Sequence, residues 1–300
     1  MTDTAVKPEP EAAPRQAPPP PRRRPRSRGA WATVRSVARV LTTLAILFFV
    51  LFPIVWMAIT AFKPARDAFS TSLIFSPTLE NFAAILGGAS DLTSALVSSV
   101  VVGVATTVVA VPLALLAAYG FSRYRFPGHR AMLLAIVATQ FIPGVAIALP
   151  FLTLFRSLGL IDTHLALVIV NLSIVVPYIT WLLKGFVDGL PTEIEEAARI
   201  DGCGQVALLW RVITPLAAPG IFVAAVFSFL LAWNEFLFPT FLSRSDAETL
   251  PVALMTLVLP EGVAWGQMAA AGLLVMAPML VMAFLVRRHF AEGMTMGAVK

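Results

Sequence analysis

Long apolar stretches separated by short polar segments dominate the chain from residue 40 onward. A helix that crosses a bilayer needs about 20 predominantly apolar residues, and these stretches lack the alternation of lipid-facing strands. Because backbone polar groups must be satisfied inside lipid, helices are the spanning structure that fits. The sequence therefore predicts an all-α integral membrane protein with six transmembrane helices. The predicted spans are residues 40–62, 92–122, 131–155, 165–183, 217–242 and a segment within 262–286.

Prolines occur inside or beside most of these apolar stretches. A helix break survives in a membrane where neighbouring groups or water satisfy the freed carbonyls. The density of prolines favours broken helices around a translocation path, with ordinary bundle packing as the alternative. The prolines are Pro53, Pro112, Pro143, Pro150, Pro177 and Pro278.

The composition supports the membrane class and excludes several kinds of site. Of the 300 residues, 58% are hydrophobic and 13% are charged, whereas about a quarter of the residues of a soluble protein are charged. The single cysteine, Cys203, excludes an internal disulfide and a cysteine-based metal site. His129, His164 and His289 lack the spacing of a metal site, and no catalytic triad or carboxylate pair converges. We therefore expect no metal, no cofactor and no catalytic residue.

Lysine and arginine are distributed unequally along the loops. Four of them, Lys63, Arg66, Arg156 and Arg244, fall on one predicted side of the membrane. Loops rich in these residues face the cytoplasm, so we predict that both termini are cytoplasmic in a bacterial-type plasma membrane. The other eighteen of the 22 lie before residue 40, in 123–130, in 184–211 and after residue 286.

The chain is predicted to have three parts. Residues 1–34 are rich in Pro, Ala and Arg, which predicts a disordered basic arm on the cytoplasmic side. Because its basic residues adjoin an apolar span, contact with anionic lipid headgroups is favoured over nucleic acid. A six-helix transmembrane domain follows at 35–290, and residues 291–300 form a cytoplasmic tail. The most charged internal loop, 184–215, joins the fourth and fifth spans.

This loop is predicted to contain two short helices joined by a glycine turn. Thr192 and Glu195 have the spacing of a capping box, so the first helix should begin near Glu193. Gly202 then ends that helix, and residues 205–211 can form a second helix before Pro215 marks the return to the membrane. Leu208 and Leu209 of the second helix are expected to pack inward. One face of the first helix would carry Ile194, Ala197, Ala198 and Asp201.

The same loop resembles a known family. Its spacing matches every interval of the EAA loop of ABC importer permeases, E-A-A-x3-G-x9-I-x-L-P. The matching residues are Glu196-Ala197-Ala198, Gly202, Val212, Thr214 and Pro215. Val212 and Thr214 depart from the usual Ile and Leu. Other parts of the chain are similar to the smaller permease subunit of sugar importers of the maltose-permease type. They are Asp201 before Gly202 and the blocks 62–64, 79–82, 117–128, 158–163, 233–236 and 293–300.

The resemblance implies a function and a set of partners. The chain has no G-x-x-x-x-G-K-[ST] motif for ATP phosphates, so the energy would come from a partner. The family implies two ATPase subunits that grip EAA helices, a second homologous permease, an extracytoplasmic binding protein and a sugar substrate. This chain would be a transport subunit rather than an enzyme. The implied coupling residues are Glu195, Glu196, Ala197, Ala198, Asp201, Gly202, Leu209 and Pro215.

Four polar side chains within the apolar stretches are candidates for the substrate path, because polar residues inside spans often mark transport routes. Their alternative role is bonding to neighbouring helices. They are Gln140, Asn171, Asn234 and Glu235. Rival functions are a permease for a non-sugar solute such as an amino acid, phosphate or polyol derivative, an intramembrane enzyme, and a self-sufficient channel or ion-driven carrier.

Overall fold

The computed structural model describes residues 30–87, 92–259 and 262–296, with side chains described between 34 and 285. The chain divides into two units, residues 1–53 and 54–300. The described part of the first unit is helical and belongs to α1 (Ala30–Ala61), whose side chains up to Pro53 are mostly exposed and apolar. Most of the predicted arm 1–34 lies outside the described residues, although α1 already begins at Ala30.

Four described helices are long and apolar enough to cross a membrane. Besides α1 they are α3 (Thr93–Arg123), α6 (His164–Asp188) and α13 (Trp265–Met296). They correspond to the predicted first, second, fourth and sixth spans. Two further bent helix pairs could each supply one more span, which gives four to six by length and composition.

The predicted third span is not one continuous helix. It consists of α4 (His129–Ala138), the short turn η2 (Thr139–Phe141) and α5 (Gly144–Ser157), with a bend of 93° between the two parts. Pro143 stands at the break as the N-cap of α5. A proline there cannot donate the backbone hydrogen bond that would continue the preceding helix.

The predicted fifth span is also divided. Helix α10 (Ala218–Trp233) is bent by 82° from the preceding helical segment Gln205–Leu216. After α10 the helix breaks, and α11 (Leu237–Leu242) completes the apolar stretch. The predicted span 217–242 therefore contains two helices.

Two of the apolar stretches are broken, but most of the prolines singled out from the sequence lie inside continuous helices, which agrees with the alternative of ordinary bundle packing. Only Pro143 of the predicted set stands at a break. The freed carbonyls of a kinked helix can be tolerated within a bundle, so proline alone does not decide where a membrane helix ends. The prolines inside continuous helices are Pro53, Pro112, Pro150, Pro177 and Pro278.

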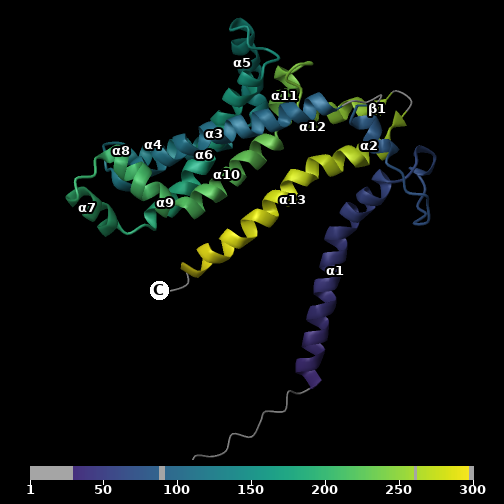
Figure 1. Ribbon diagram of the computed structural model, residues 1–300, viewed down its shortest axis with the longest axis horizontal. Coiled ribbons are helices and arrows are strands. Elements are labelled where there is room, and N and C mark those ends of the chain that lie inside the picture. The colour runs from purple at the N-terminus through teal and green to yellow at the C-terminus, as the bar shows by residue number, and fades with distance from the viewer. Residues whose placement is uncertain (1–29, 88–91, 260–261, 297–300) are drawn as a thin grey trace, which may run out of the picture. The chain divides into compact units, whose positions relative to one another are not determined.

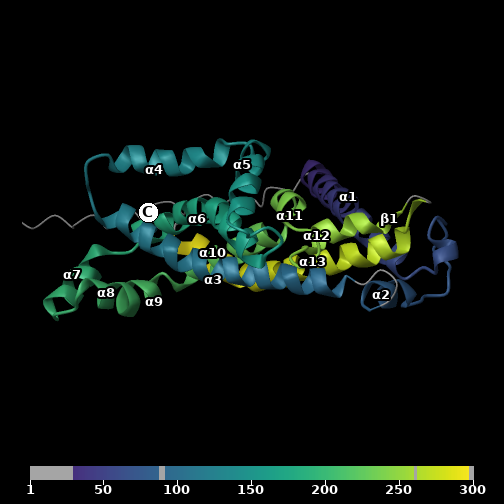
Figure 2. The same ribbon diagram turned by 90° about the horizontal axis from the view of Figure 1, so that it is seen from above.

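Helices α3, α6 and α10 pack against one another at the centre of the second unit (Figure 1). Ala110, Ala114 and Ala118 repeat every fourth residue along α3 and are fully buried in this core. Small residues let helix backbones approach closely, which matters in lipid because apolar burial alone does not drive association. In Figure 2, α7 and α8 lie at one end of this group, and α2 and β1 lie at the other.

Short elements gather at the end opposite α7 and α8. The turn η1 (Ala65–Asp67) and α2 (Glu80–Ile85) follow α1. After α11 come α12 (Leu250–Ala253), η4 (Leu254–Leu257) and an antiparallel pair of strands. The strands, β1 (Val258–Leu259) and β2 (Gly262–Val263), pair Val258 with Val263.

Replacing Gly220 with alanine should destabilise the contact between α6 and α10. A Cβ at Gly220 would lie 2.4 Å from Cγ of Phe186, so the ring or the helix must move. Overpacking of this kind costs about 1–3 kcal/mol, which should lower the melting temperature of the purified protein. Gly185→Ala is the matched control, because a Cβ there meets nothing within 4 Å. A second change, Phe186→Ala, should recover part of the loss; an unaltered melting temperature for Gly220→Ala would contradict the expected clash.

Candidate functional site

The loop 184–215 folds as a helix, a glycine turn and a second helical segment. Helix α7 (Thr192–Ile200) is followed by Gly202 at φ +84° and then by α8 (Gln205–Leu208). The predicted second helix, 205–211, ends differently, because the backbone widens into the π-helix η3 (Leu209–Ile213) before α9 (Thr214–Leu216). Pro215 is the second residue of α9 and is exposed.

Gly202 closes α7 with a left-handed turn. The N–H of Cys203 donates to the carbonyl of Ala198 at 2.9 Å, and the N–H of Gly202 donates to that of Arg199 at 3.0 Å. A residue with positive φ between such bonds is the usual end of a helix, and glycine adopts it without a steric penalty. The turn fixes the angle at which α8 leaves α7.

The predicted capping box is wrong. Pro191 is the N-cap of α7 and makes no side-chain capping bond. Glu195, which was expected to reach back to the start of the helix, is instead only 3% exposed. Its carboxylate faces α3 and accepts hydrogen bonds from two side chains there instead of from the backbone at the start of α7.

Those donors are Arg123 and Tyr119 near the cytoplasmic end of α3 in the predicted orientation. Arg123 Nε lies 2.5 Å from Glu195 Oε1, and the Tyr119 hydroxyl donates to Glu195 Oε2 at 3.1 Å. Arg123 Nη2 also donates to the carbonyl of Leu190 at 3.0 Å. A second contact joins the Tyr124 hydroxyl to Gln205 Oε1 at 3.1 Å. The loop is therefore fastened to α3 on both sides of its glycine turn.

The loop also carries several exposed apolar side chains. Ile200 is 86% exposed and Val206 is 73% exposed, and Ile194 and Trp210 are also exposed. Glu196, Ala197 and Asp201 are exposed as well, while Ala198 is half-buried and contacts the core. We call Ile194, Ala197, Ile200, Val206 and Trp210 the loop apolar face. Leu208 and Leu209 are instead buried in the core, as predicted.

A second polar site, at the opposite end of the core helices, was not singled out from the sequence. The Asp162 carboxylate accepts hydrogen bonds from the backbone N–H groups of residues 244–247 at 2.8–3.2 Å, and from the Ser245 hydroxyl. The Asp162 N–H donates to the carbonyl of Leu242. Burial raises the pKa of Asp162, but these donors outweigh it and hold the pKa well below its usual value.

Replacing Asp162 with asparagine should loosen the segment after α11. Hydrogen bonds to a charged group contribute about 1.5–3 kcal/mol, so the melting temperature should fall. Folding lowers the pKa of Asp162. Its carboxylate therefore contributes fully to the free energy of unfolding above the pKa of the unfolded state, and this contribution is lost only as the pH falls towards the pKa of the folded state. The difference between wild type and variant should thus be constant from about pH 5 to pH 8. Asp246→Asn, which removes an exposed carboxylate in the same segment, should have little effect on the melting temperature. Equal decreases in both variants would contradict a stabilising role of the hydrogen bonds to Asp162.

No group of three or more His, Cys, Asp or Glu side chains that could hold a metal ion occurs among the described residues.

Residues 110–295 match a protein family described as the binding-protein-dependent transport system inner membrane component. The match spans more than half of the chain, including the loop and both its contacts with α3. The chain belongs to this family. It is therefore a multi-pass protein of the inner membrane and a permease component of a transport system, as predicted.

Individual relatives agree with the family match over almost their whole length. The trehalose transport system permease protein SugB of Mycobacterium tuberculosis is 33% identical over 266 residues, which is 87% of this chain and 96% of SugB. The galactooligosaccharides transport system permease protein GanQ of Bacillus subtilis is 30% identical over 276 residues, which is 89% of this chain and 98% of GanQ.

A solved structure has the same fold. It is a bacterial ABC transporter involved in the import of the acidic polysaccharide alginate, and one of its chains matches with a TM-score of 0.71. The match covers 87% of this permease and 98% of that chain, at 20% sequence identity. At that identity the likeness supports the fold of the permease.

The four predicted path residues lie in different environments in the permease. Gln140, in η2, donates from Nε2 to the carbonyl of Ile174 on α6 at 3.2 Å. Asn171 lies one turn earlier on α6, is 2% exposed and donates to the carbonyl of Leu167. The structure thus brings Gln140 beside the part of α6 that carries Asn171.

Asn234 and Glu235 occupy the break between α10 and α11. Asn234 is exposed, and its Nδ2 donates to the carbonyl of Leu230 at 2.7 Å. Glu235 accepts a bond from the N–H of Phe238 at 3.1 Å, which satisfies a free donor at the start of α11. Both residues therefore stabilise the ends of the broken helix, and their role in a substrate path stays a prediction.

Proposed function

We propose that this permease is one of two transmembrane subunits of an ATP-driven importer that carries sugars or oligosaccharides into the cytoplasm. It would have six spans, with each bent helix pair counting as one, and cytoplasmic termini. The excess of lysine and arginine at the ends of α3 and α6 that adjoin the loop 184–215 supports this orientation. Residues 1–34 would form a cytoplasmic arm, 35–290 the membrane domain and 291–300 a tail.

The observation that carries the proposal is the loop apolar face. Several large apolar side chains stand exposed on a short, rigidly fastened loop that is outside the apolar spans. Exposed apolar patches of this kind mark interaction sites. The occupant we propose is an ATPase subunit, because the chain lacks a phosphate-binding motif of its own. Glu196, beside the face, would meet a basic group of that partner.

The contacts with α3 explain how movement of the loop would reach the membrane. Glu195 and Arg123 form a nearly buried ion pair, with side-chain exposures of 5% and 11%. Leu208, Leu209 and Ile213 pack into the same core as α3 and α6. When two ATPase subunits close on ATP, a gripped loop would therefore carry the adjoining helices as one body. Such rigid-body motion can alternate access between the two sides of the membrane.

The substrate class rests on the named relatives. SugB and GanQ are permease proteins for trehalose and galactooligosaccharides, and both align with nearly all of this chain. A permease for an amino acid, phosphate or polyol derivative is the alternative, and no feature of the described residues favours it. The remaining partners we propose are a second homologous permease and an extracytoplasmic solute-binding protein. The binding-protein dependence in the family description supports the second of these.

Uptake by the reconstituted transporter tests this function. Proteoliposomes would contain the permease with its partner subunits, ATP inside, and the binding protein with radiolabelled trehalose or galactooligosaccharides outside. We expect uptake that requires both ATP and the binding protein. Uptake of amino acids or phosphate but of no sugar would overturn the substrate class. Sugar uptake that continues without the ATPase subunits would overturn the docking role of the loop.

Within the same assay, Gln140→Ala and Asn234→Ala test the substrate path. Loss of a hydrogen bond to bound sugar should raise KM several-fold, since such a bond contributes about 0.5–1.5 kcal/mol. Ser173→Ala is a control from the same region of α6, because its hydroxyl bonds to the carbonyl of Val170 within its own helix. If KM and the maximal rate of both variants equal those of the control, Gln140 and Asn234 lie outside the path.

A further inference from the structure

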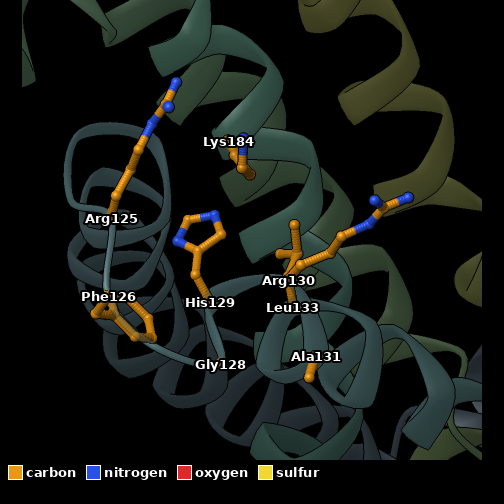
Figure 3. Close-up of a pocket in the computed structure, with 8 residues that line it drawn as sticks. All are labelled: Arg125, Phe126, Gly128, His129, Arg130, Ala131, Leu133 and Lys184. Atoms are coloured by element: carbon orange, nitrogen blue, oxygen red, sulfur yellow. The ribbon is translucent and has the colours of Figure 1, made fainter.

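A basic hollow lies where the chain passes from α3 into α4. Its volume is about 800 Å³, and α6 contributes to its wall. Figure 3 shows the imidazole ring of His129 near its centre, with Arg125 and Arg130 extending in different directions and Lys184 above. In the proposed orientation, these residues stand at the cytoplasmic ends of three membrane helices. The hollow is separate from the loop apolar face and from the four path residues.

The charge of this hollow is poorly compensated. Within the described part of the chain, Arg125 and Arg130 form no ion pair and no side-chain hydrogen bond. Lys184 pairs with Asp188 at 2.7 Å, and among the described residues that carboxylate is the one anionic group bonded to any of the three cations. His129 adds a buried Nδ1 atom without a hydrogen-bond partner among the described residues. Arginines without partners beside a membrane are suited to bind a phosphate group.

Two exposed apolar side chains stand within about one helical turn of residues that line the hollow. Leu134 stands one helical turn after Arg130 on α4 and is 59% exposed. Trp181 stands three residues before Lys184 on α6 and is 57% exposed. Tryptophan is enriched where a membrane helix meets the headgroup region. A basic group followed by exposed apolar surface matches a molecule that has an anionic head and hydrocarbon chains.

We propose that this hollow binds the phosphate headgroup of an anionic phospholipid of the cytoplasmic leaflet. Arg125 and Arg130 are exposed on two sides of the hollow, and their long side chains would turn towards the phosphate oxygens, while Lys184 would add a third positive charge. The acyl chains would lie along Leu134 and Trp181. Basic pockets between membrane helices on the cytoplasmic side are a known means of recognising anionic headgroups. The choice of leaflet rests on the proposed orientation of the permease, whereas the binding itself does not depend on its substrate or its ATPase.

The proposed site can be tested by lipid retention of the full-length permease in its assembled transporter. The transporter would be purified in detergent, exposed to dioleoyl phosphatidylglycerol or dioleoyl phosphatidylcholine, and examined by native mass spectrometry. We expect retention of phosphatidylglycerol in preference to phosphatidylcholine. The double variant Arg125→Gln/Arg130→Gln should weaken this retention roughly 30-fold, since each basic residue near an anionic surface contributes roughly fivefold.

The matched control is Arg35→Gln/Arg39→Gln, which removes the same charge from an exposed stretch of α1 at the predicted cytoplasmic side. This control should retain phosphatidylglycerol as the wild type does. Equal losses in both double variants would show diffuse attraction and overturn the site. Displacement of the lipid by millimolar inorganic phosphate would identify a site for soluble phosphate and also overturn it. Lipid retention and sugar uptake are measured in separate experiments. A failure of the proposed transport function can therefore be told apart from a failure of the proposed lipid site.

Discussion

Replacing Gly202 with valine is expected to suppress ATP-dependent uptake while the permease stays inserted and assembled. Gly202 has φ +84°, and a Cβ there meets nothing within 4 Å, so the obstacle is the backbone conformation alone. A residue other than glycine in the left-handed region costs about 1–3 kcal/mol. That cost should lower the ratio of the turn to other backbone conformations by roughly 5- to 150-fold, and ATP-dependent uptake should fall as the turn loses population.

Gly204→Val provides the control for this experiment. Gly204 lies two residues further along, has φ −70°, and also has open space around its Cβ position. Valine accepts that backbone conformation readily, so uptake should be close to that of the wild type. Uptake rates and the amount of assembled transporter would be measured for both variants. Equal uptake by the two would show that the left-handed turn is not needed for coupling.

The sequence pattern predicted the apolar helices well, because their signal is long and local. Runs of apolar residues located α1, α3, α6 and α13 without any knowledge of their neighbours. The breaks in the third and fifth apolar stretches were not located, because prolines occur both at breaks and inside continuous helices. Pro143 stands at a break while Pro150, seven residues later, lies within α5. The two prolines differ in the tertiary structure around them, which cannot be predicted from the local sequence.

The candidate site was predicted in outline, and its polar contacts were not. The helical spacing of Ile194, Ala197, Ala198 and Asp201, followed by Gly202, indicated a helix and a turn, because both are local features. Glu195 was assigned to a capping box three residues away, yet its partner is Arg123, 72 residues earlier in the chain. Asp162 likewise bonds to residues more than 80 positions away. Partners this distant are set by tertiary packing, for which a single sequence has no signal.

Replacement by alanine should therefore affect the stability of the permease very differently at the neighbouring residues Glu195 and Glu196. Glu195→Ala leaves the guanidinium of Arg123 nearly buried without its carboxylate, and removing one partner of a buried pair costs about 3–5 kcal/mol. We expect a lower melting temperature and a loss of uptake. Glu196 is exposed and has no partner within the described residues. Glu196→Ala should change stability by no more than about 0.5 kcal/mol, while ATP-dependent uptake falls if this side chain meets the ATPase.

A double-mutant cycle separates the interaction between Arg123 and Glu195 from a general destabilisation of α7. Because the two side chains interact directly, Arg123→Ala/Glu195→Ala should be less destabilised than the sum of the single changes, by about 0.5–3 kcal/mol. Arg123→Ala/Glu196→Ala should be additive, since Glu196 does not contact Arg123. Melting temperatures and ATP-dependent uptake of all variants would be measured in the same assembled transporter. Additive losses in the first pair would mean that the loop is held by its apolar contacts through Leu208 and Leu209, and that the ion pair does not transmit its movement to α3.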